Sequence, residues 1–351
     1  MKWKDGLIKM HNKYYDRLEK KEGFYELNID SFNDFIDLLR PDNLNINQIM
    51  TFLRYKTNPL LINFVKFGEV KITSPSILDN SLVYRGHGNS EWELKSTFDR
   101  QEFDNFFIKN FTHRHQAEFE LLKNFQDSCD LAGVYLPSDG SEIRKKQLKH
   151  YNEFFGVEEL TEVKMEWFNQ EFFELAAFAQ HYGVPTRLLD WSKNPFVACY
   201  FANSNALEQN YDLNKKITIW VLNYTDLDST LKNVLKILDL PKGVNQHISH
   251  QQGVLTYTEL NDELYSLILE DSKEKLLPIS LNKILEHYKN EFRLLKINLS
   301  FEHLTRLYQY CNAHNFNACH LFRGAYGAAL HTKDIMNYEK FNFEEKIEAL
   351  I

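Results

Sequence analysis

The stretch from Ala179 to Ala202, AQHYGVPTRLLDWSKNPFVACYFA, constrains the fold more than any other part of the chain. The apolar, Ala-rich segment 171–180 predicts a helix that ends at the Gly-Val-Pro sequence after it, because glycine favours helix ends and proline cannot continue a helix. Thr186–Trp191 then predicts a short extended segment. Ser192 is the predicted N-cap of a second, strongly apolar helix with Pro195 in its first turn. Two buried helices are therefore expected to flank a polar turn.

That turn holds Arg187 and Asp190 among apolar neighbours. An unpaired charge is costly to bury, so both side chains need partners. One interpretation is an internal ion pair between Arg187 and Asp190 that braces the turn, since perturbed charge networks are often structural. The other interpretation is a functional site.

Two further segments accompany this stretch: Tyr84-Arg85-Gly86 upstream and His250-Gln251-Gln252-Gly253 downstream. Together with the AQHYGVPTRLLDW run, they resemble the bacterial FRG-domain family, which is named for its Phe/Tyr-Arg-Gly motif. The resemblance covers roughly Leu82 to Leu330. A second Phe-Arg-Gly at Phe322–Gly324 is interpreted as coincidental, because a true repeat would duplicate more than three residues.

The length of 351 residues allows two average domains or one elaborated α/β or α+β domain. The predicted class is α+β. We expect a helical N-terminal segment over 1–80, an FRG domain over 81–335 with a helical insertion at about 101–170, and a C-terminal tail over 336–351. The clearest predicted strand is Lys216–Leu222, and a helix is predicted over Leu231–Leu238.

Composition excludes some classes of function. The net charge of −8 gives no global basic surface for nucleic acid. The strongest basic cluster, Arg144–His150, is interpreted as a solvated helix face, with polyanion contact as the alternative. Four cysteines and the His113–Gln116 run lack metal-site spacing, so reduced thiols and no metal are expected. No signal peptide or apolar membrane span is evident, which predicts a soluble cytoplasmic protein without membrane contact.

FRG-domain proteins also resemble ADP-ribosyltransferases distantly. The resemblance implies a core of two small sheets with flanking helices and with NAD, as substrate, bound in the cleft between the sheets. Tyr84-Arg85-Gly86 corresponds to the first strand, whose glycine backbone holds the nicotinamide carboxamide. Asp190-Trp191-Ser192 and the following helix correspond to the second element. Gln251-Gln252-Gly253 stands where the transferases carry Glu-x-Glu.

This resemblance implies roles for individual residues. Arg85 would clamp ribose or pyrophosphate, Asp190 the ribose or the acceptor, and Gln251 a ribose hydroxyl; these three are the predicted catalytic residues. An amide cannot act as a general base, so Asp190 or Glu259 would replace the missing glutamate. His181 and Tyr182 would stack on nicotinamide, and Arg187 would serve the phosphates. The predicted NAD-binding residues are Tyr84, Gly86, His181, Tyr182, Thr186, Arg187, Ser192 and Gln252.

The resulting hypothesis is a mono-ADP-ribosyltransferase toxin of a toxin–antitoxin or phage-defence system. Its acceptor would be RNA or protein, and an antitoxin and a chaperone are possible partners. Glycine after a strand arginine allows close approach of another molecule, and arginine offers a planar fork of donors to phosphate. The alternative is a nonenzymatic nucleotide- or partner-binding module in which Arg85 pairs internally with a carboxylate such as Asp190. A hydrolase or nuclease that uses His181 and Asp190 ranks last, since it lacks a metal cluster or a nucleophile elbow.

Overall fold

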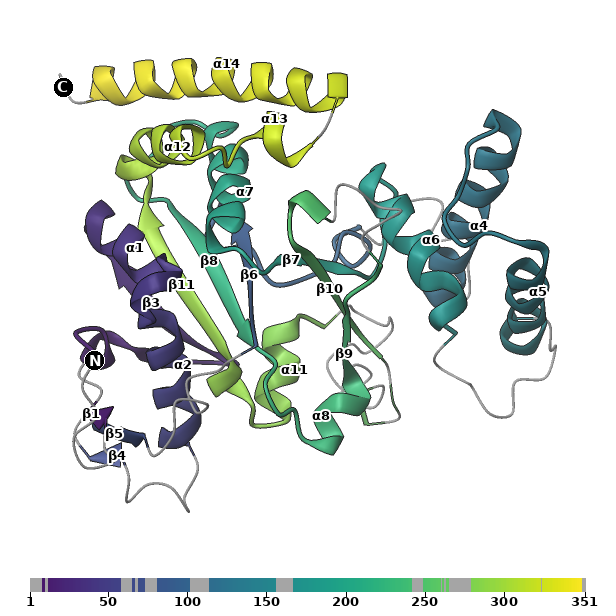
Figure 1. Ribbon diagram of the computed structural model, residues 1–351, viewed down its shortest axis with the longest axis horizontal. Coiled ribbons are helices and arrows are strands. Elements are labelled where there is room, and N and C mark those ends of the chain that lie inside the picture. The colour runs from purple at the N-terminus through teal and green to yellow at the C-terminus, as the bar shows by residue number, and fades with distance from the viewer. Residues whose placement is uncertain are drawn as a thin grey trace.

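A computed structural model describes residues 8–9, 12–57, 65–66, 69–72, 81–101, 114–155, 167–241, 249–259, 261, 263–264, 279–322 and 324–348. Its centre is a mixed eight-stranded sheet with the order β2-β3-β11-β8-β6-β7-β10-β9 (Figure 1). The strands of this sheet are β2 (Glu19–Lys21), β3 (Phe24–Ile29), β6 (Leu82–His87), β7 (Leu189–Ser192), β8 (Lys216–Asn223), β9 (Leu235–Leu238), β10 (Gly253–Thr258) and β11 (Leu294–Ser300). A separate small sheet has the order β1-β5-β4, with β1 (Ile8–Lys9), β4 (Val65–Lys66) and β5 (Glu69–Ile72).

Helices cover both faces and one end of the central sheet (Figure 1). They are α1 (Phe32–Leu39), α2 (Asn45–Lys56), α4 (Arg114–Ala132), α5 (Ser141–Phe155), α6 (Gln170–His181), α7 (Pro195–Leu207), α8 (Ser229–Val234), α11 (Leu281–His287), α12 (Leu304–Ala313), α13 (Ala318–Leu321) and α14 (Gly324–Glu348).

Strand β8 separates two hydrophobic cores. Ile217, Ile219 and Val221 face the core formed with α1, α2, α7 and α12. Trp220 and Leu222 point to the opposite core, which includes residues of α8 and α11. All five side chains are buried, as the two-residue period of a strand with both faces covered requires. The predicted strand over Lys216–Leu222 is confirmed.

The central sheet is nearly divided between β6 and β7. These strands share a single residue pair, Tyr84 with Ser192. In contrast, β6 pairs with β8 from Leu82 to His87, and β7 pairs with β10 from Leu189 to Ser192. The sheet therefore consists of a five-stranded part and a three-stranded part that diverge beyond one contact. This geometry replaces the predicted two small sheets with one continuous sheet.

The prediction of two helices on either side of a short extended segment is confirmed by α6, β7 and α7. The capping prediction is wrong. Asn194, not Ser192, is the N-cap of α7, and its side chain accepts a hydrogen bond from the Phe196 amide at 2.9 Å. Ser192 remains in β7, because its pairing with Gly253 and Tyr84 holds the backbone extended. Pro195 occupies the first turn of α7, as predicted.

The N-terminal segment contains the predicted helices, but it also supplies strands to the central sheet. Ser31 is the N-cap of α1, and its side chain accepts a hydrogen bond from the Asp34 amide. Strand β3 pairs in parallel with β11 from Tyr25 to Ile29 and buries alternate side chains. Because β3 carries part of the main core, residues 12–57 are structurally continuous with the sheet. Helix α14 likewise runs without interruption across residues 335 and 336.

The helix predicted over Leu231–Leu238 is only half correct. Helix α8 ends at Val234, and Leu235–Leu238 form β9, which pairs with β10. The exposed edge of β10 supplies hydrogen-bond partners that local periodicity does not reveal, so tertiary pairing overrides helix propensity.

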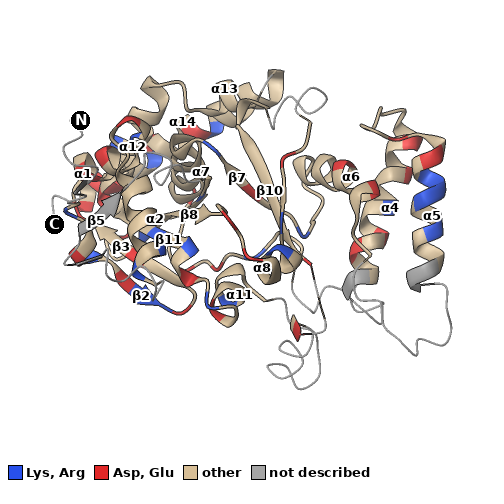
Figure 2. Ribbon diagram, turned by 60° about the horizontal axis from the view of Figure 1, so that its bottom comes forward, with Lys and Arg blue, Asp and Glu red and all other residues tan. Residues whose placement is uncertain are grey.

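Other features concern charge and small motifs. Lys and Arg concentrate on α5 (Figure 2), where Arg144 is paired with Asp130 and Asp139. Among the described residues, no helix has the length and apolar character needed to cross a membrane, and no cluster of His, Cys, Asp and Glu could hold a metal ion. His113 lies outside the described residues. The four cysteines are free thiols.

Candidate functional site

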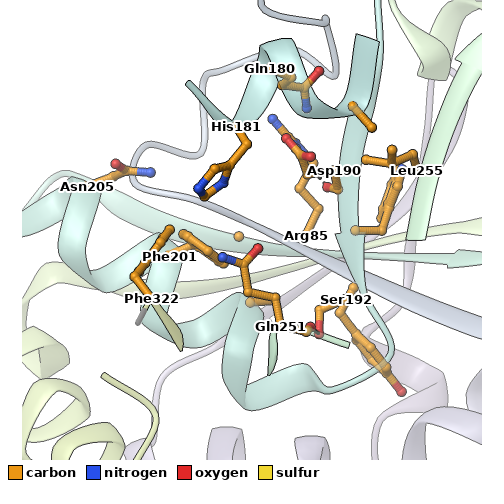
Figure 3. A pocket seen from close by; sticks show the side chains of 15 residues that line it. Arg85, Gln180, His181, Asp190, Ser192, Phe201, Asn205, Gln251, Leu255 and Phe322 are labelled. Atoms are coloured by element: carbon orange, nitrogen blue, oxygen red, sulfur yellow. Dashed lines mark hydrogen bonds and ion pairs between the residues drawn. The ribbon is translucent and has the colours of Figure 1, made fainter. Parts of the chain in front are cut away.

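A pocket of about 260 Å³ lies where β6 and β7 diverge (Figure 3). Its walls come from β6, β7, α6, α7, β10 with the turn before it, and the residue after α13. Seven of the predicted site residues line it: Tyr84, Arg85, Gly86, His181, Asp190, Ser192 and Gln251. The three predicted catalytic residues, which lie far apart in the sequence, therefore meet in one cavity.

Arg85 is held in the pocket wall by two hydrogen bonds. Its Nη1 donates to the carbonyl oxygen of Asp190 at 2.7 Å, and its Nε donates to Nε2 of His87 at 3.2 Å. The side chain is 14% exposed. Burial lowers the pKa of Arg85, while the Asp190 carboxylate opposes this shift. Within the described residues, Nη2 makes no hydrogen bond, so this edge of the guanidinium is available to a ligand.

His87 sets the orientation of Arg85. The imidazole is 2% exposed, and its Nδ1 lies 3.3 Å from the Trp92 carbonyl oxygen and 3.3 Å from Nε1 of Trp220. Because Arg85 Nε donates to Nε2, the proton of a neutral imidazole is on Nδ1 and is donated to the Trp92 carbonyl; in that tautomer Nδ1 cannot accept from Nε1 of Trp220. Burial and the nearby Arg85 hold the pKa of His87 well below its ordinary value, which favours this neutral form. The i, i+2 spacing of Arg85 and His87 in a predicted strand was a signal for this contact, because such residues share a face of the sheet.

Asp190 is the carboxylate of the pocket. Its Oδ2 lies 3.9 Å from Nη1 of Arg85. The side chain is 59% accessible to water, yet it stands inside the concavity with protein on several sides. This enclosure raises the pKa of Asp190, and the charge of Arg85 only partly offsets the shift. The distance of 3.9 Å indicates a loose ion pair, because the tight contact of Arg85 is to the Asp190 backbone.

Gln180 is a polar residue of the pocket that the sequence reasoning missed. Its Oε1 accepts a hydrogen bond from the Thr186 hydroxyl. Its Nε2 is buried and has no hydrogen-bond partner with good geometry among the described residues. That amide faces Asp190, where it lowers the carboxyl pKa without reaching full hydrogen-bond geometry (Figure 3). Gln180 therefore supplies a donor directed at the Asp190 carboxylate.

Aromatic rings form another wall of the pocket. His181, Phe201 and Phe322 all line the cavity (Figure 3). Phe201 and Phe322 meet edge to face with ring centres 6.0 Å apart. The rings of His181 and Phe322 are inclined by 24°, with centres 6.5 Å apart. Phe322 belongs to the second Phe-Arg-Gly sequence, and the interpretation of that motif as coincidental overlooked its place in the site.

Ser192 connects the pocket to the turn before β10. Its hydroxyl donates to the carbonyl oxygen of Gln251 at 2.7 Å and accepts from the Asn194 amide at 2.9 Å. These bonds hold the backbone of Gln251, whose side chain points into the cavity (Figure 3). Gln252 is a turn residue with φ of 49°, and its carbonyl accepts from the Lys193 amide. It does not line the pocket.

Three other predicted site residues also lie outside the pocket lining. Tyr182 is 63% exposed at the end of α6. Thr186 is fully buried and bonds to Thr97 and Gln180, so it supports the pocket wall from behind. Arg187 pairs with Glu118 of α4 rather than with Asp190 or a phosphate site.

The Arg187–Glu118 pair corrects both earlier interpretations of Arg187. Nε donates to the two carboxylate oxygens at 3.0 and 2.8 Å, and Nη2 lies 2.7 Å from Oε2. The guanidinium also packs over the rings of Trp167 and Phe168. The two charged side chains are only 7% and 2% exposed. Arg187 therefore joins α4 to the central turn as a structural ion pair, which sequence could not show because Glu118 is 69 residues away.

Gly86 also has an internal reason to be glycine. A Cβ at this position would overlap the Ala198 carbonyl and approach the Ala202 amide of α7. The missing side chain thus lets α7 cross β6 closely. Gly86 still lines the pocket, but close helix–strand packing alone requires glycine here.

Glu259 does not join the pocket. It forms an ion pair with Lys236 at 2.9 Å, and both residues line a separate, shallow depression beside β9. Asp190 is consequently the candidate carboxylate of the site.

Arg100 is an exposed residue whose charge acts on Arg85, His87 and Asp190, so it lies near the pocket although it was not predicted to be a site residue.

The fold and the pocket define a mixed α/β protein with a ligand-sized cavity in a divided sheet. Residues 80–211 match the FRG domain, so this part of the chain is an FRG domain. The match includes Arg85, His181 and Asp190, and it ends before Gln251 and Phe322. No curated protein and no solved structure matches the chain.

Proposed function

We propose that this FRG-domain protein is an NAD-dependent mono-ADP-ribosyltransferase that modifies an RNA or protein acceptor. The observation that carries the proposal is the convergence of Arg85, Asp190 and Gln251 on a single cavity at the division of the sheet. The resemblance to ADP-ribosyltransferases implied a cleft between two small sheets. The cavity of this protein lies instead within one continuous sheet, at the place where β6 and β7 share only the pair Tyr84 and Ser192.

The side chains present suit one end of a dinucleotide. The Nη2 edge of Arg85 and Nε2 of Gln180 are donors, and Asp190 is an acceptor for hydroxyl groups. Aromatic rings supply apolar surface for a base. A volume of about 260 Å³ is slightly below the usual range of ~300–1,000 Å³ for ligand sites. The cavity would therefore hold one ring and its sugar, with the remaining phosphates near the mouth.

Charge assigns roles around this cavity. Arg85 would orient the ribose or the adjacent phosphate from the buried wall. Arg100 would attract the phosphates in place of Arg187, because Arg187 is ion-paired with Glu118. The acceptor oxygen would form a bond to C1′ of the nicotinamide ribose of NAD as the C1′–N glycosidic bond breaks, and nicotinamide would leave with the electron pair of that bond. Asp190 would accept the proton of the attacking acceptor hydroxyl, and its raised pKa makes it a stronger base than an ordinary carboxylate.

The test is transfer of label from NAD labelled in the ADP-ribose part to total cellular RNA and, separately, to total cellular protein. Wild type is expected to label one of the two pools. Asp190→Asn is expected to lower the rate by ~10²–10⁴-fold, the usual contribution of general acid–base catalysis. Glu259→Gln is the matched control, because its carboxylate lies in the other depression. Equal rates for Asp190→Asn and wild type would remove the catalytic role of Asp190.

The second candidate is a nonenzymatic nucleotide- or partner-binding module. It is favoured by the internal hydrogen bonds of Arg85 to His87 and to the Asp190 backbone, which a purely structural arginine would also make. Saturable NAD binding with no label in either pool would select this candidate.

A role as a toxin predicts that expression of wild type, but not of Asp190→Asn, arrests growth.

A further inference from the structure

Asn205 lines the pocket, but neither the predicted chemistry nor the proposed function uses it. It lies on α7 four residues after Phe201 and seven after Ala198, so these three pocket-lining residues share one face of the helix. At ~1.5 Å of rise per residue, the backbone of Asn205 lies roughly 10 Å along the helix from Ala198. Figure 3 shows Asn205 across the cavity from Asp190. Asn205 therefore marks an end of the cavity that Asp190 and Arg85 do not occupy.

The fold makes no use of the side-chain amide of Asn205. Within the part of the chain that the structure describes, its Oδ1 and Nδ2 form no hydrogen bond to protein. Two other asparagines of the same segment are committed: Asn194 caps α7, and buried Asn203 donates from Nδ2 to the Leu304 carbonyl at 2.9 Å. The Asn205 amide is exposed at the pocket instead, so its donor and acceptor are available to a ligand.

The backbone that carries this amide is fixed by close packing. A Cβ on Gly88 would lie 2.7 Å from Cβ of Asn205, so the chain after β6 touches α7 at this point. Nε2 of Gln209 donates to the carbonyl oxygens of Gly88 and Asn205, at 2.9 and 3.3 Å. The position from which the side chain extends is therefore set before a ligand binds, which lowers the entropic cost of binding.

A primary amide is uncharged and carries both a donor and an acceptor. It matches a neutral ligand group of the same kind, such as a carboxamide or the amino edge of a nucleobase. A ligand carboxylate would have no proton to donate to Oδ1 of Asn205, and Arg85 is engaged with the Asp190 carbonyl. An apolar ligand group would desolvate the amide without replacing its hydrogen bonds to water, which is costly.

We infer that Asn205 determines specificity in this pocket by binding the neutral polar edge of the ligand's ring. The group it selects carries a hydrogen-bond donor, as a carboxamide or an exocyclic amine does. This inference deepens the proposed function, on which it rests for the identity of the ligand as a nucleotide.

The test measures affinity by calorimetry for wild type, Asn205→Leu and Asn205→Asp, with the fold of each verified by circular dichroism. Two pairs of ligands vary the polar edge of one ring. Nicotinamide mononucleotide is compared with nicotinic acid mononucleotide, and AMP with the purine ribonucleotide that lacks the amino group. Wild type should prefer the first member of one pair, and that pair identifies the ring.

The preference should fall in Asn205→Leu by roughly 2- to 12-fold, which corresponds to ~0.5–1.5 kcal/mol for one hydrogen bond. Asn205→Asp keeps an acceptor at the same position, so it should retain the preference. Ribose 5-phosphate carries no ring and should bind wild type and Asn205→Leu equally. The control is Asn210→Leu, the same change at an exposed asparagine that contacts Lys340 rather than the pocket. It should bind every ligand as wild type does.

An unchanged preference in folded Asn205→Leu would overturn the inference and leave the transferase proposal standing if label transfer persists. Equal weakening of ribose 5-phosphate and the ring-bearing ligands would also overturn it, because Asn205 would then act only on the shape of the pocket. A preference that depends on Asn205 in a protein that transfers no label would support the inference and contradict the transferase. If no ring-bearing ligand binds wild type at millimolar concentration, the inference is wrong.

Discussion

Replacing Arg187 by methionine should lower the free energy of unfolding substantially while leaving the ligand site intact. Methionine keeps an unbranched side chain against Trp167 and Phe168 but leaves the Glu118 carboxylate buried without its cation. Breaking one partner of a buried pair typically costs about 3–5 kcal/mol. Both side chains here are at most 7% exposed, and three short contacts join them. We therefore expect Arg187→Met to lose about 3–5 kcal/mol of stability. This is a large part of the ~5–15 kcal/mol that stabilises an ordinary domain.

The assay is equilibrium urea unfolding of Arg187→Met, Glu118→Leu and the double variant, with NAD affinity measured on the folded proteins. The single variants should lose stability. The double variant should recover only part of the loss, because both buried charges are gone but the amide of residue 187 loses its acceptor, Oε1 of Glu118. NAD affinity should change little in any of them. The reasoning is refuted if Arg187→Met remains within about 0.5 kcal/mol of wild type but loses NAD binding, which is the behaviour of a phosphate-binding residue.

Three further changes probe the pocket. Gly86→Ala should destabilise the protein by about 1–3 kcal/mol or more in urea unfolding, because the new methyl group meets α7 backbone; wild-type stability would show that β6 and α7 can separate freely. His87→Phe should weaken NAD binding by removing the acceptor for Arg85 Nε, and an unchanged dissociation constant in the folded variant would dismiss the positioning role. Asp190→Asn should stabilise the fold at neutral pH. The pKa of Asp190 is raised in the folded state, so wild type loses stability as the pH rises from the ordinary value of 3.8 through the folded pKa, whereas asparagine does not ionise. Urea unfolding of both proteins from pH 3.5 to 7.5 should therefore show a difference that grows with pH, and a difference that shrinks with pH would reverse the assigned environment.

Sequence predicted the elements around the site better than the contacts between them. Local signals sufficed for α6 and α7, since an apolar run, a Gly-Val-Pro stop and Pro195 are all short-range features. They failed at Leu235–Leu238, where the partner strand β10 decides the conformation. The cap of α7 was misassigned by two residues because Ser192 is committed to the sheet.

The candidate site shows the same division. Motif resemblance brought Arg85, Asp190 and Gln251 together correctly in space, although their catalytic roles stay predictions. It could not separate Arg187 from the pocket, because the partner Glu118 lies on a distant helix whose sequence carries no special motif. Gln180 and Phe322 were missed for a related reason: a glutamine at a helix end and a phenylalanine after a short helix acquire meaning only when the cavity is assembled.

The most direct measurement is a crystal structure of the Asp190→Asn variant soaked with NAD, because this substitution is expected to prevent turnover. The account predicts density in the cavity between β6 and β7, with a ring against its aromatic wall and a sugar or phosphate oxygen within hydrogen-bond distance of Arg85. Density beside Lys236 and Glu259 instead, or an empty cavity at saturating NAD, would contradict it.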